Sequence, residues 1–416
     1  MVGSPVQSTS AQPEPLKAAA TSQAIDSSLP ARVQSSAPPL AAALELKPPN
    51  AVPWMTGIRE KATPSVPKEL RGPVGADPRL LTTSEGDSIR YSETLANGVT
   101  KKVHVAVNDT GKPIALAALY LGDTKDGRPA TASTRSKSNP DDVAREALLM
   151  QHIGWKDISI VEVAEDVHDG LKVKAFMSME LMDGDLDPAH GNIWQSGMPP
   201  NEPETAGARL CFILKSVAES LQTLHETKVE FSTRRGPITS EGVFHGDMKP
   251  DNLFFRHSRI DGEPPVCRIG DLGLAGPVGS RSWSSGTNNY CSPEQHDGKA
   301  MTGKSDVFGL VSTMLEIIVP GTTIMNADYE QLTGQDLLER IGETLKKAVD
   351  SGALDAKTAA GFQQLFNAMV SEDPQGRPTA GQVAQKADEL LAGRDCKWKG
   401  IPSPHQPILD RLATAE

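Results

Sequence analysis

Short runs of alternating apolar and polar residues predict β-strands between about residue 90 and residue 183. "TKKVHVAV" (100–107) and "KPIALAALYL" (112–121) flank the turn-forming letters "NDTG", which predicts an antiparallel hairpin. A helix-like segment, "DDVAREALLMQHIG" (141–154), begins with acidic residues that suit the positive end of a helix dipole. Two more strand-like runs follow it, "ISIVEVAED" (158–166) and "KAFMSMELM" (174–182).

Apolar residues recur every three or four positions after "DGDLDP" (183–188), and this spacing predicts helices, most clearly at 206–226 and 305–319. The start of the chain differs, because its first fifty residues contain eight prolines and no aromatic residue, a composition that predicts disorder. We expect an α+β fold with a disordered leader at 1–78, a small β-rich lobe at 79–183, a larger helical lobe at 184–393 and a tail at 394–416.

Composition narrows the functions to consider. The 416 residues carry a net charge of −11, which argues against nucleic-acid binding. The four cysteines lie far apart, which predicts neither a disulfide framework nor a zinc site and favours a reducing, cytoplasmic compartment. No segment approaches the roughly 18 apolar residues of a membrane span, so we expect no membrane insertion. The oligomeric state is left open.

Two motifs carry the groups that phosphoryl transfer requires: metal ligands, a cation near the phosphates and a carboxylate near the attacking hydroxyl. In "HGDMKPDNLFF" (245–255), Asp247 could receive the hydroxyl proton, Lys249 could reach the γ-phosphate and Asn252 could hold a metal. In "VCRIGDLGLAG" (266–276), Asp271 could bridge magnesium to two phosphates, since magnesium prefers such oxygen ligands.

Together with "SGTNNYCSPEQ" (285–295), "KSDVFGL" (304–310) and "DPQGRPTA" (373–380), these motifs resemble the eukaryotic-type protein kinase family over about residues 90 to 393. The resemblance implies a bilobal kinase fold, ATP and Mg²⁺ as cofactors, and Ser or Thr of a protein as the substrate. It implies roles for a set of residues outside the catalytic loop: Glu294 and Arg377 as an ion pair under the substrate platform, Gly286 and Thr287 as the shelf for the substrate residue, Asp306 on the catalytic-loop backbone, Glu146 as the partner of the ATP-anchoring lysine, Glu180 and Met182 in the adenine-binding hinge, and Gly98, Val103 and Ala115 around ATP.

One position breaks the family pattern, because Ala117 stands where the ATP-anchoring lysine is expected. A charge at about 4 Å from a phosphate is worth on the order of 4 kcal/mol, or roughly three decades of rate. In "LANGVTKKV" (95–103), Lys101 replaces the third glycine of the phosphate loop, which resembles the with-no-lysine kinases. If the "NDTG" turn closes on Val107 and Lys112, Lys102 instead falls opposite Ala117, so Lys102 remains an alternative to Lys101. A third interpretation is that both lysines are exposed to solvent at a strand edge and neither contacts a phosphate.

Gly246 is the second departure, since many kinases have an arginine there that meets a phosphate on the activation segment. Its absence suggests activity without that switch, although Ser280, Ser282, Ser284 and Ser285 remain candidate phosphosites. "HGD" is also typical of small-molecule phosphotransferases, but those usually lack the "SPE" letters and the arginine that pairs with them.

Three hypotheses therefore stay open: an active Ser/Thr protein kinase, a pseudokinase scaffold whose missing lysine is real, and a small-molecule phosphotransferase. The Ser/Pro/Ala-rich leader is also similar to that of bacterial effectors injected by a type III system. The stretch from His225 to His245 is longer than the family's usual connection and suggests a surface insertion, with or without partner contacts.

Overall fold

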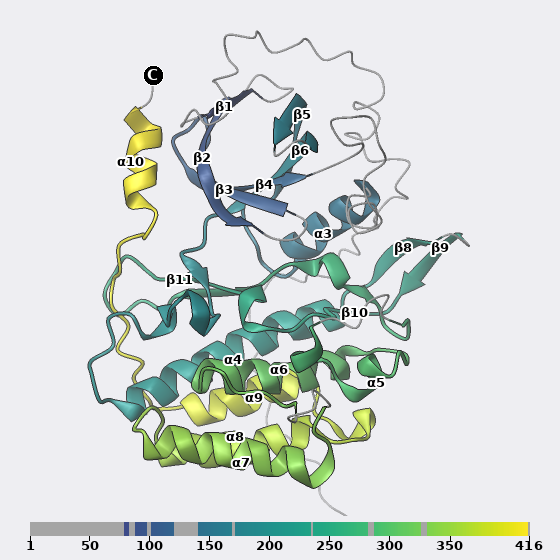
Figure 1. Ribbon diagram of the computed structural model, residues 1–416, viewed down its shortest axis with the longest axis vertical. Helices are drawn as coiled ribbons and strands as arrows, with labels where there is room; N and C mark the ends of the chain where they lie inside the picture. The colour runs from purple at the N-terminus through teal and green to yellow at the C-terminus, as the bar shows by residue number, and fades with distance from the viewer. Residues whose placement is uncertain are drawn as a thin grey trace, which may run out of the picture. The chain divides into compact units, whose positions relative to one another are not determined.

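The computed structural model describes residues 79–82, 88–97, 101–119, 140–168, 171–233, 236–281, 287–325 and 331–414. The leader expected at 1–78 lies outside these residues, and all of them belong to the unit Leu44–Glu416. Within this unit an antiparallel sheet with one helix precedes a part built mainly of helices, so the expected α+β fold is confirmed (Figure 1).

The sheet has six strands, and every neighbouring pair in it is antiparallel. Its strands are β1 (Arg79–Thr82), β2 (Ser88–Asn97), β3 (Lys101–Val107), β4 (Pro113–Leu119), β5 (Ser159–His168) and β6 (Leu171–Glu180). Their order across the sheet is β1-β2-β3-β4-β6-β5. The hairpin predicted from "TKKVHVAV" and "KPIALAALYL" is confirmed as β3 and β4.

The register of that hairpin differs by one residue from the closure that we considered. Val107 pairs with Pro113 rather than with Lys112, so Val103 and not Lys102 lies opposite Ala117. The reason is local: Asn108 Oδ1 accepts the Lys112 N–H at 2.8 Å, and Gly111 adopts a φ of +81°, which glycine tolerates well. These contacts keep Lys112 inside the loop.

The remaining described strands are short and lie in the second part of the chain. They are β7 (Gly184–Asp185), β8 (Val229–Thr233), β9 (Gly236–Ser240), β10 (Val243–Phe244), β11 (Leu253–Arg256), β12 (Val266–Ile269) and β13 (Gly276–Pro277). Strand β11 lies between β12 and β7, and β10 pairs with β13. These ladders place the loops that contain Asp247 and Asp271 next to each other.

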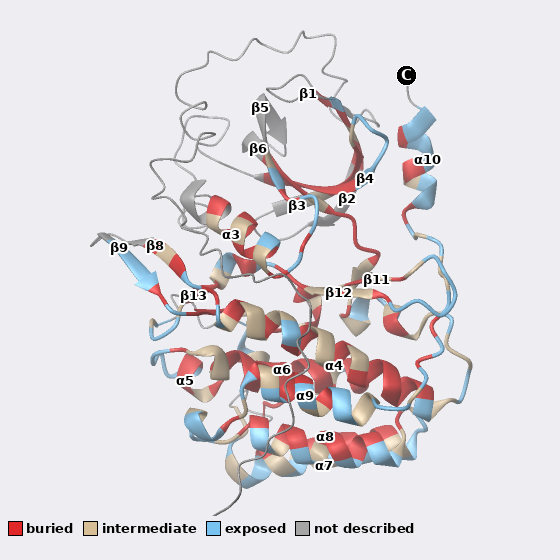
Figure 2. Cartoon of the chain, turned by 180° about the vertical axis from the view of Figure 1, so that it is seen from behind, coloured by how far each residue is buried: buried red, intermediate tan, exposed pale blue. Residues whose placement is uncertain are grey.

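The described helices include both helices that the apolar spacing predicted most clearly. They are α3 (Pro140–His152), α4 (Pro203–His225), α5 (Pro293–His296), α6 (Gly303–Ile318), α7 (Gly334–Asp350), α8 (Ala356–Met369), α9 (Ala380–Leu391) and α10 (Gln406–Thr414). Helix α6 is buried along most of its length, including polar residues such as Asp306 and Thr313. In Figure 2 buried residues are red and gather where the helices pack on one another. A capping box of Thr302 and Ser305 fixes where α6 begins.

The insertion between His225 and His245 forms a β-hairpin of β8 and β9 rather than an irregular loop. The burial along β8 alternates as in a strand with one buried face, because Val229 and Phe231 are buried in the main core while Glu230 between them is only partly buried. The Arg145 guanidinium of α3 lies 5.0 Å from the centre of the Phe231 ring. The insertion therefore packs against the helix that contains Glu146.

Candidate active site

Asp306, in the first turn of α6, holds the backbone of the segment that contains Asp247. Its Oδ2 accepts the His245 N–H at 2.8 Å, and its Oδ1 accepts the Gly246 N–H at 2.9 Å. His225, at the end of α4, approaches Oδ2 through Nε2 at 2.8 Å. Because Asp306 is buried, these donors replace the water that its carboxylate loses on folding.

Gly246 has a backbone reason to be glycine. Its φ is +81°, and a Cβ at this position would lie 3.0 Å from the carbonyl oxygen of Leu274. The Gly246 carbonyl accepts a hydrogen bond from Gln295 Nε2 at 2.7 Å. The local conformation is sufficient to explain a glycine at this position. Activity that does not require phosphorylation of the activation segment stays a prediction.

The Asp247 carboxylate lies among groups from three segments. Its Oδ1 accepts the Thr287 N–H at 3.1 Å and the Thr287 hydroxyl at 2.9 Å. Asn252 Nδ2 donates to the Asp247 backbone carbonyl at 2.8 Å, and Lys249 Nζ lies 3.6 Å from Asp247 Oδ2. This arrangement places a carboxylate, a cation and a hydroxyl-bearing side chain within a few ångströms of one another.

His245 fixes the backbone on either side of this carboxylate. Its Nδ1 accepts the Asp247 N–H at 3.2 Å, and its Nε2 lies 3.0 Å from the Gly270 carbonyl oxygen. Since a carbonyl only accepts, the imidazole proton is on Nε2. His245 therefore ties the loop of Asp247 to the turn of Asp271.

Asn252 and Asp271 lie at the same end of the β11–β12 ladder. Leu253 pairs with Ile269, and the Gly270 N–H donates to the Asn252 carbonyl at 2.9 Å. Asp271 is exposed and adopts a left-handed φ of 54°, which Asp tolerates better than most residues. The Asn252 amide nitrogen donates to Asp247, so the amide oxygen is available as a metal ligand. An amide oxygen and a carboxylate fit magnesium.

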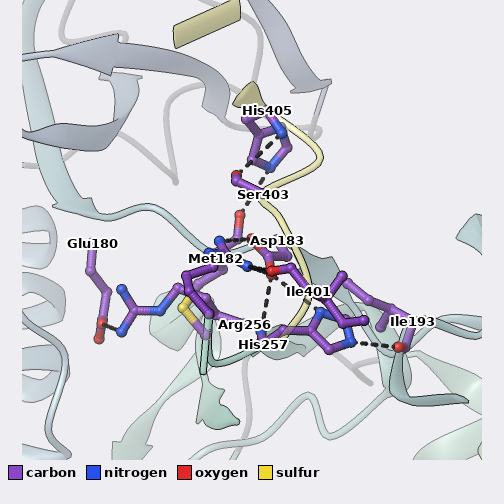
Figure 3. Close-up of polar contacts among 10 residues, drawn as sticks. Glu180, Met182, Asp183, Ile193, Arg256, His257, Ile401, Ser403 and His405 are labelled. Atoms are coloured by element: carbon purple, nitrogen blue, oxygen red, sulfur yellow. Dashed lines mark hydrogen bonds and ion pairs between the residues drawn. The ribbon is translucent and has the colours of Figure 1, made fainter. Parts of the chain in front are cut away.

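The segment after β6 is fixed by a dense polar network (Figure 3). The Glu180 side chain, which is buried, meets Arg268 Nε at 3.2 Å and Arg256 Nη2 at 3.1 Å. Asp183 accepts both terminal nitrogens of Arg259, at 2.7 and 2.9 Å, and the His257 N–H at 3.0 Å. These contacts tie the expected hinge to β11, to β12 and to the loop between them.

The lowered pKa of the Asp183 carboxyl makes the stability of the fold depend on pH. Burial alone would raise the pKa of this carboxyl, but hydrogen bonds from His257 and Arg259 outweigh burial and lower the pKa from 3.8 to about 2. A carboxylate with a depressed pKa contributes stability above its ordinary pKa and loses it as the pH falls towards the depressed value. Urea unfolding of the parent and of Asp183→Asn measures this contribution. We expect the difference in unfolding free energy between the two proteins to become smaller as the pH is lowered from 4 to 2. A constant difference would contradict this assignment.

The Glu294 carboxylate and the Arg377 guanidinium form a bidentate ion pair at 2.7 and 3.0 Å. Ser305 donates to Glu294 Oε1 at 2.7 Å, and Arg377 Nε donates to the Ser371 carbonyl at 2.8 Å. Both charged side chains are buried. The pair therefore joins α5, which follows the Thr287 segment, to the turn before α9.

The lysine candidates lie in β3, and the backbone pairing decides their register. Lys101 pairs with Leu119 and Lys102 with Ala118, while Val103 pairs with Ala117. Alternate residues share a face of a sheet, so position 101 belongs to the face of Ala117 and position 102 to the opposite face. Glu146 is buried in α3. Gly98 and Gly286 lie outside the described residues.

The comparison with protein families is decisive for this chain. The family described as "Protein kinase domain" matches residues 91–387, which is most of the chain. The chain belongs to the protein kinase family. Members of this family typically use ATP and Mg²⁺, and the family implies a protein substrate for this kinase.

Individual relatives of this kinase are distant. The serine/threonine-protein kinase mos of Patiria pectinifera is 23% identical over 284 residues, which cover 64% of this chain and 69% of that protein. The serine/threonine-protein kinase Pkn1 of Myxococcus xanthus is 28% identical over 172 residues, which cover 40% of this chain and 20% of that protein. The kinase thus spans about two thirds of the first relative and a fifth of the second.

Several contacts at the kinase's site were not anticipated from the sequence. Gln295 on Gly246, His225 on Asp306 and His405 on Met182 each join positions far apart in the chain. The sequence does contain one signal for a helix in the C-terminal segment, since the apolar residues Ile408, Leu409 and Leu412 recur at helical spacing.

No helix in the described part of the kinase is long and apolar enough to cross a membrane.

Proposed function

We propose that this kinase transfers the γ-phosphate of ATP to Ser or Thr of a protein substrate. The arrangement around Asp247 supports the proposal most strongly, because its carboxylate contacts Thr287 and lies 3.6 Å from Lys249. Phosphoryl transfer depends on positioning and electrostatics rather than on covalent chemistry from the protein, and this site offers both. The similarity to two Ser/Thr kinases supports the choice of Ser or Thr.

Each residue has a role in this proposal. Asp247 orients the substrate hydroxyl and accepts its proton, and Lys249 stabilises charge on the transferred group. Asn252 and Asp271 would hold Mg²⁺, which neutralises phosphate charge when bound. The hinge at Glu180 to Met182 would receive the adenine beside Val103 and Ala115. Thr287, with Gly286, would form the shelf for the substrate residue above the Glu294–Arg377 pair.

The replacement of the missing lysine is part of the same proposal. Position 101 shares the sheet face of Ala117 through the pairing of Val103 with Ala117, and this register favours Lys101 over Lys102 as the cation that reaches the phosphates. Glu146 of α3 would orient that lysine. The arrangement is similar to the one implied by the resemblance to with-no-lysine kinases.

Transfer of labelled phosphate from Mg-ATP to a generic protein substrate tests the proposal. We expect Lys101→Met to lower the rate at least about tenfold more than Lys102→Met does, because only one of the two positions shares the face of Ala117. The two variants are matched controls for each other. Equal rates in both variants and the parent would exclude a relocated lysine.

A pseudokinase is the second candidate, and one observation favours it. Ala117 is fully buried in the main core at the position where the family places its lysine. No transfer by the parent above the Asp247→Asn background would establish this alternative. The Glu294–Arg377 pair supports a protein substrate over a small molecule, since small-molecule phosphotransferases usually lack it.

A further inference from the structure

The chain continues beyond the residues that match the kinase family, and this extension returns to the sheet. The family match ends at residue 387, whereas the described residues continue to 414. In Figure 1 the yellow C-terminal segment leaves the helical part, runs past β11 and ends as α10 beside β2. Helix α10 contacts both β2 and β3. We call residues 396–414 the C-terminal strap.

The first part of the strap is anchored by a buried arginine. Arg209 of α4 donates to the carbonyls of Cys396 at 2.8 Å and Lys397 at 2.9 Å. The same guanidinium lies 4.4 Å from the ring centre of Trp398, which is also buried. Arg209 is fully buried, so the strap carbonyls and the ring stabilise a charge that would otherwise be costly to bury.

The middle of the strap is attached to the residue that follows Met182. Arg259, which forms the bidentate pair with Asp183, also donates to the Ile401 carbonyl at 2.6 Å. The Ile401 N–H in turn donates to the Ser258 carbonyl at 3.0 Å. One guanidinium thus connects the strap directly to the segment between the sheet and the helical part.

The next contact is on the hinge itself. His405 is buried, and its Nε2 lies 3.0 Å from the carbonyl oxygen of Met182 (Figure 3). Because a carbonyl only accepts, His405 Nε2–H is the donor. Among the described residues the Met182 N–H has no hydrogen-bond partner. His405 therefore occupies the acceptor of Met182 and leaves its donor for a ligand.

Helix α10 completes the attachment through apolar packing. Leu409 and Leu412 are buried in a cluster with Val105, Ala115 and Leu181. Ala115 and Ala117 lie two positions apart in β4 and share one face of the sheet. The strap thus covers part of the same face on which the proposed nucleotide site lies.

We infer that the C-terminal strap positions the hinge for adenine, with His405 as a positioning residue that acts through Met182. The inference rests on the proposed function, because it assigns a role in nucleotide affinity to residues beyond the family match. A fixed Met182 carbonyl restricts the peptide orientations of the hinge, so its free N–H points in one direction before the nucleotide arrives. Loss of the strap contact should weaken nucleotide binding more than it slows the chemical step.

The test uses the full chain and four variants. We expect His405→Ala to raise the Kd for MgADP about fivefold, the effect of one lost hydrogen bond, and to raise KM for ATP with kcat within about twofold. His405→Gln retains an N–H donor and should recover most of the affinity. Leu412→Asp, which places a charge in the apolar cluster, should weaken binding further. Gln406→Ala, at an exposed neighbouring position, is the matched control.

Amide hydrogen exchange at residues 180–183 of the nucleotide-free chain separates this inference from the proposed function. Faster exchange in His405→Ala than in Gln406→Ala supports the strap, and equal exchange with an equal Kd overturns it. If the parent does not bind MgADP, the proposed function is wrong. Hinge exchange then decides alone whether the strap holds the hinge, since that readout does not depend on nucleotide.

Discussion

Replacement of Asp247 by Asn is expected to lower the rate of phosphate transfer by about three decades without unfolding the chain. Asn keeps an oxygen for the Thr287 N–H and hydroxyl, which donate to Asp247 Oδ1 at 3.1 and 2.9 Å. It cannot accept a proton from the substrate hydroxyl, and it also removes the charge opposite Lys249. The variant therefore separates the chemical step from the structure of the loop.

Initial rates with labelled ATP and a protein substrate measure this effect, and urea unfolding measures stability. Asp350→Asn is a matched control, because Asp350 is exposed at the end of α7 and, within the described part of the chain, forms its ion pair with Lys346 on the helix surface. A rate for Asp247→Asn within tenfold of the parent would remove Asp247 from the chemical step.

Replacement of Arg377 by Met is expected to lower the free energy of unfolding by about 3–5 kcal/mol, because it leaves the buried Glu294 carboxylate without its cation. Arg377 is 1% exposed, and its guanidinium also lies 4.9 Å from the ring centre of Phe308. Urea unfolding at pH 7 measures the loss. Lys346→Met, at an exposed ion pair, is the control and should change stability by less than about 0.5 kcal/mol.

The same variant should change the response to pH. Burial alone would raise the pKa of Glu294, but hydrogen bonds from Arg377 and Ser305 outweigh burial and hold the pKa below its ordinary value of 4.5. In the parent, the ionised Glu294 therefore contributes stability at a pH above its ordinary pKa. This stability is lost as the pH falls through the lowered pKa of the folded state. In Arg377→Met the carboxyl loses its cation, so stability should depend less on acid. A double replacement of Glu294 and Arg377 by Met that is as unstable as the single variant would contradict this account.

Local patterns in the sequence were sufficient for much of the fold. The alternation around "NDTG" predicted β3 and β4, and apolar spacing predicted α4 and α6, because burial of one face is readable from neighbours in the chain. The register of the hairpin was left open, and it differs by one residue from the closure that would place Lys102 opposite Ala117. It depends on the Asn108 side chain, which caps the Lys112 N–H, and a propensity argument does not contain that contact.

Contacts between distant residues were harder to anticipate. The pairing of Glu294 with Arg377, which joins residues 83 positions apart, was expected only through the family resemblance. The hairpin of β8 and β9 was not foreseen, although Val229 and Phe231 alternate with polar residues. The C-terminal tail was assigned no structure, because periodicity alone does not reveal that β3 covers the apolar face of α10.

The packing of α10 also has a consequence for synthesis of the chain. Val105, Val107 and Ala115 leave the ribosome before the helical part, whereas Leu409 and Leu412, which pack against them, leave it after that part. During translation of the whole helical part, this apolar surface of the sheet has no final partner and is open to chaperones or to other nascent chains. The sheet therefore reaches its final packing only after α10 has been translated.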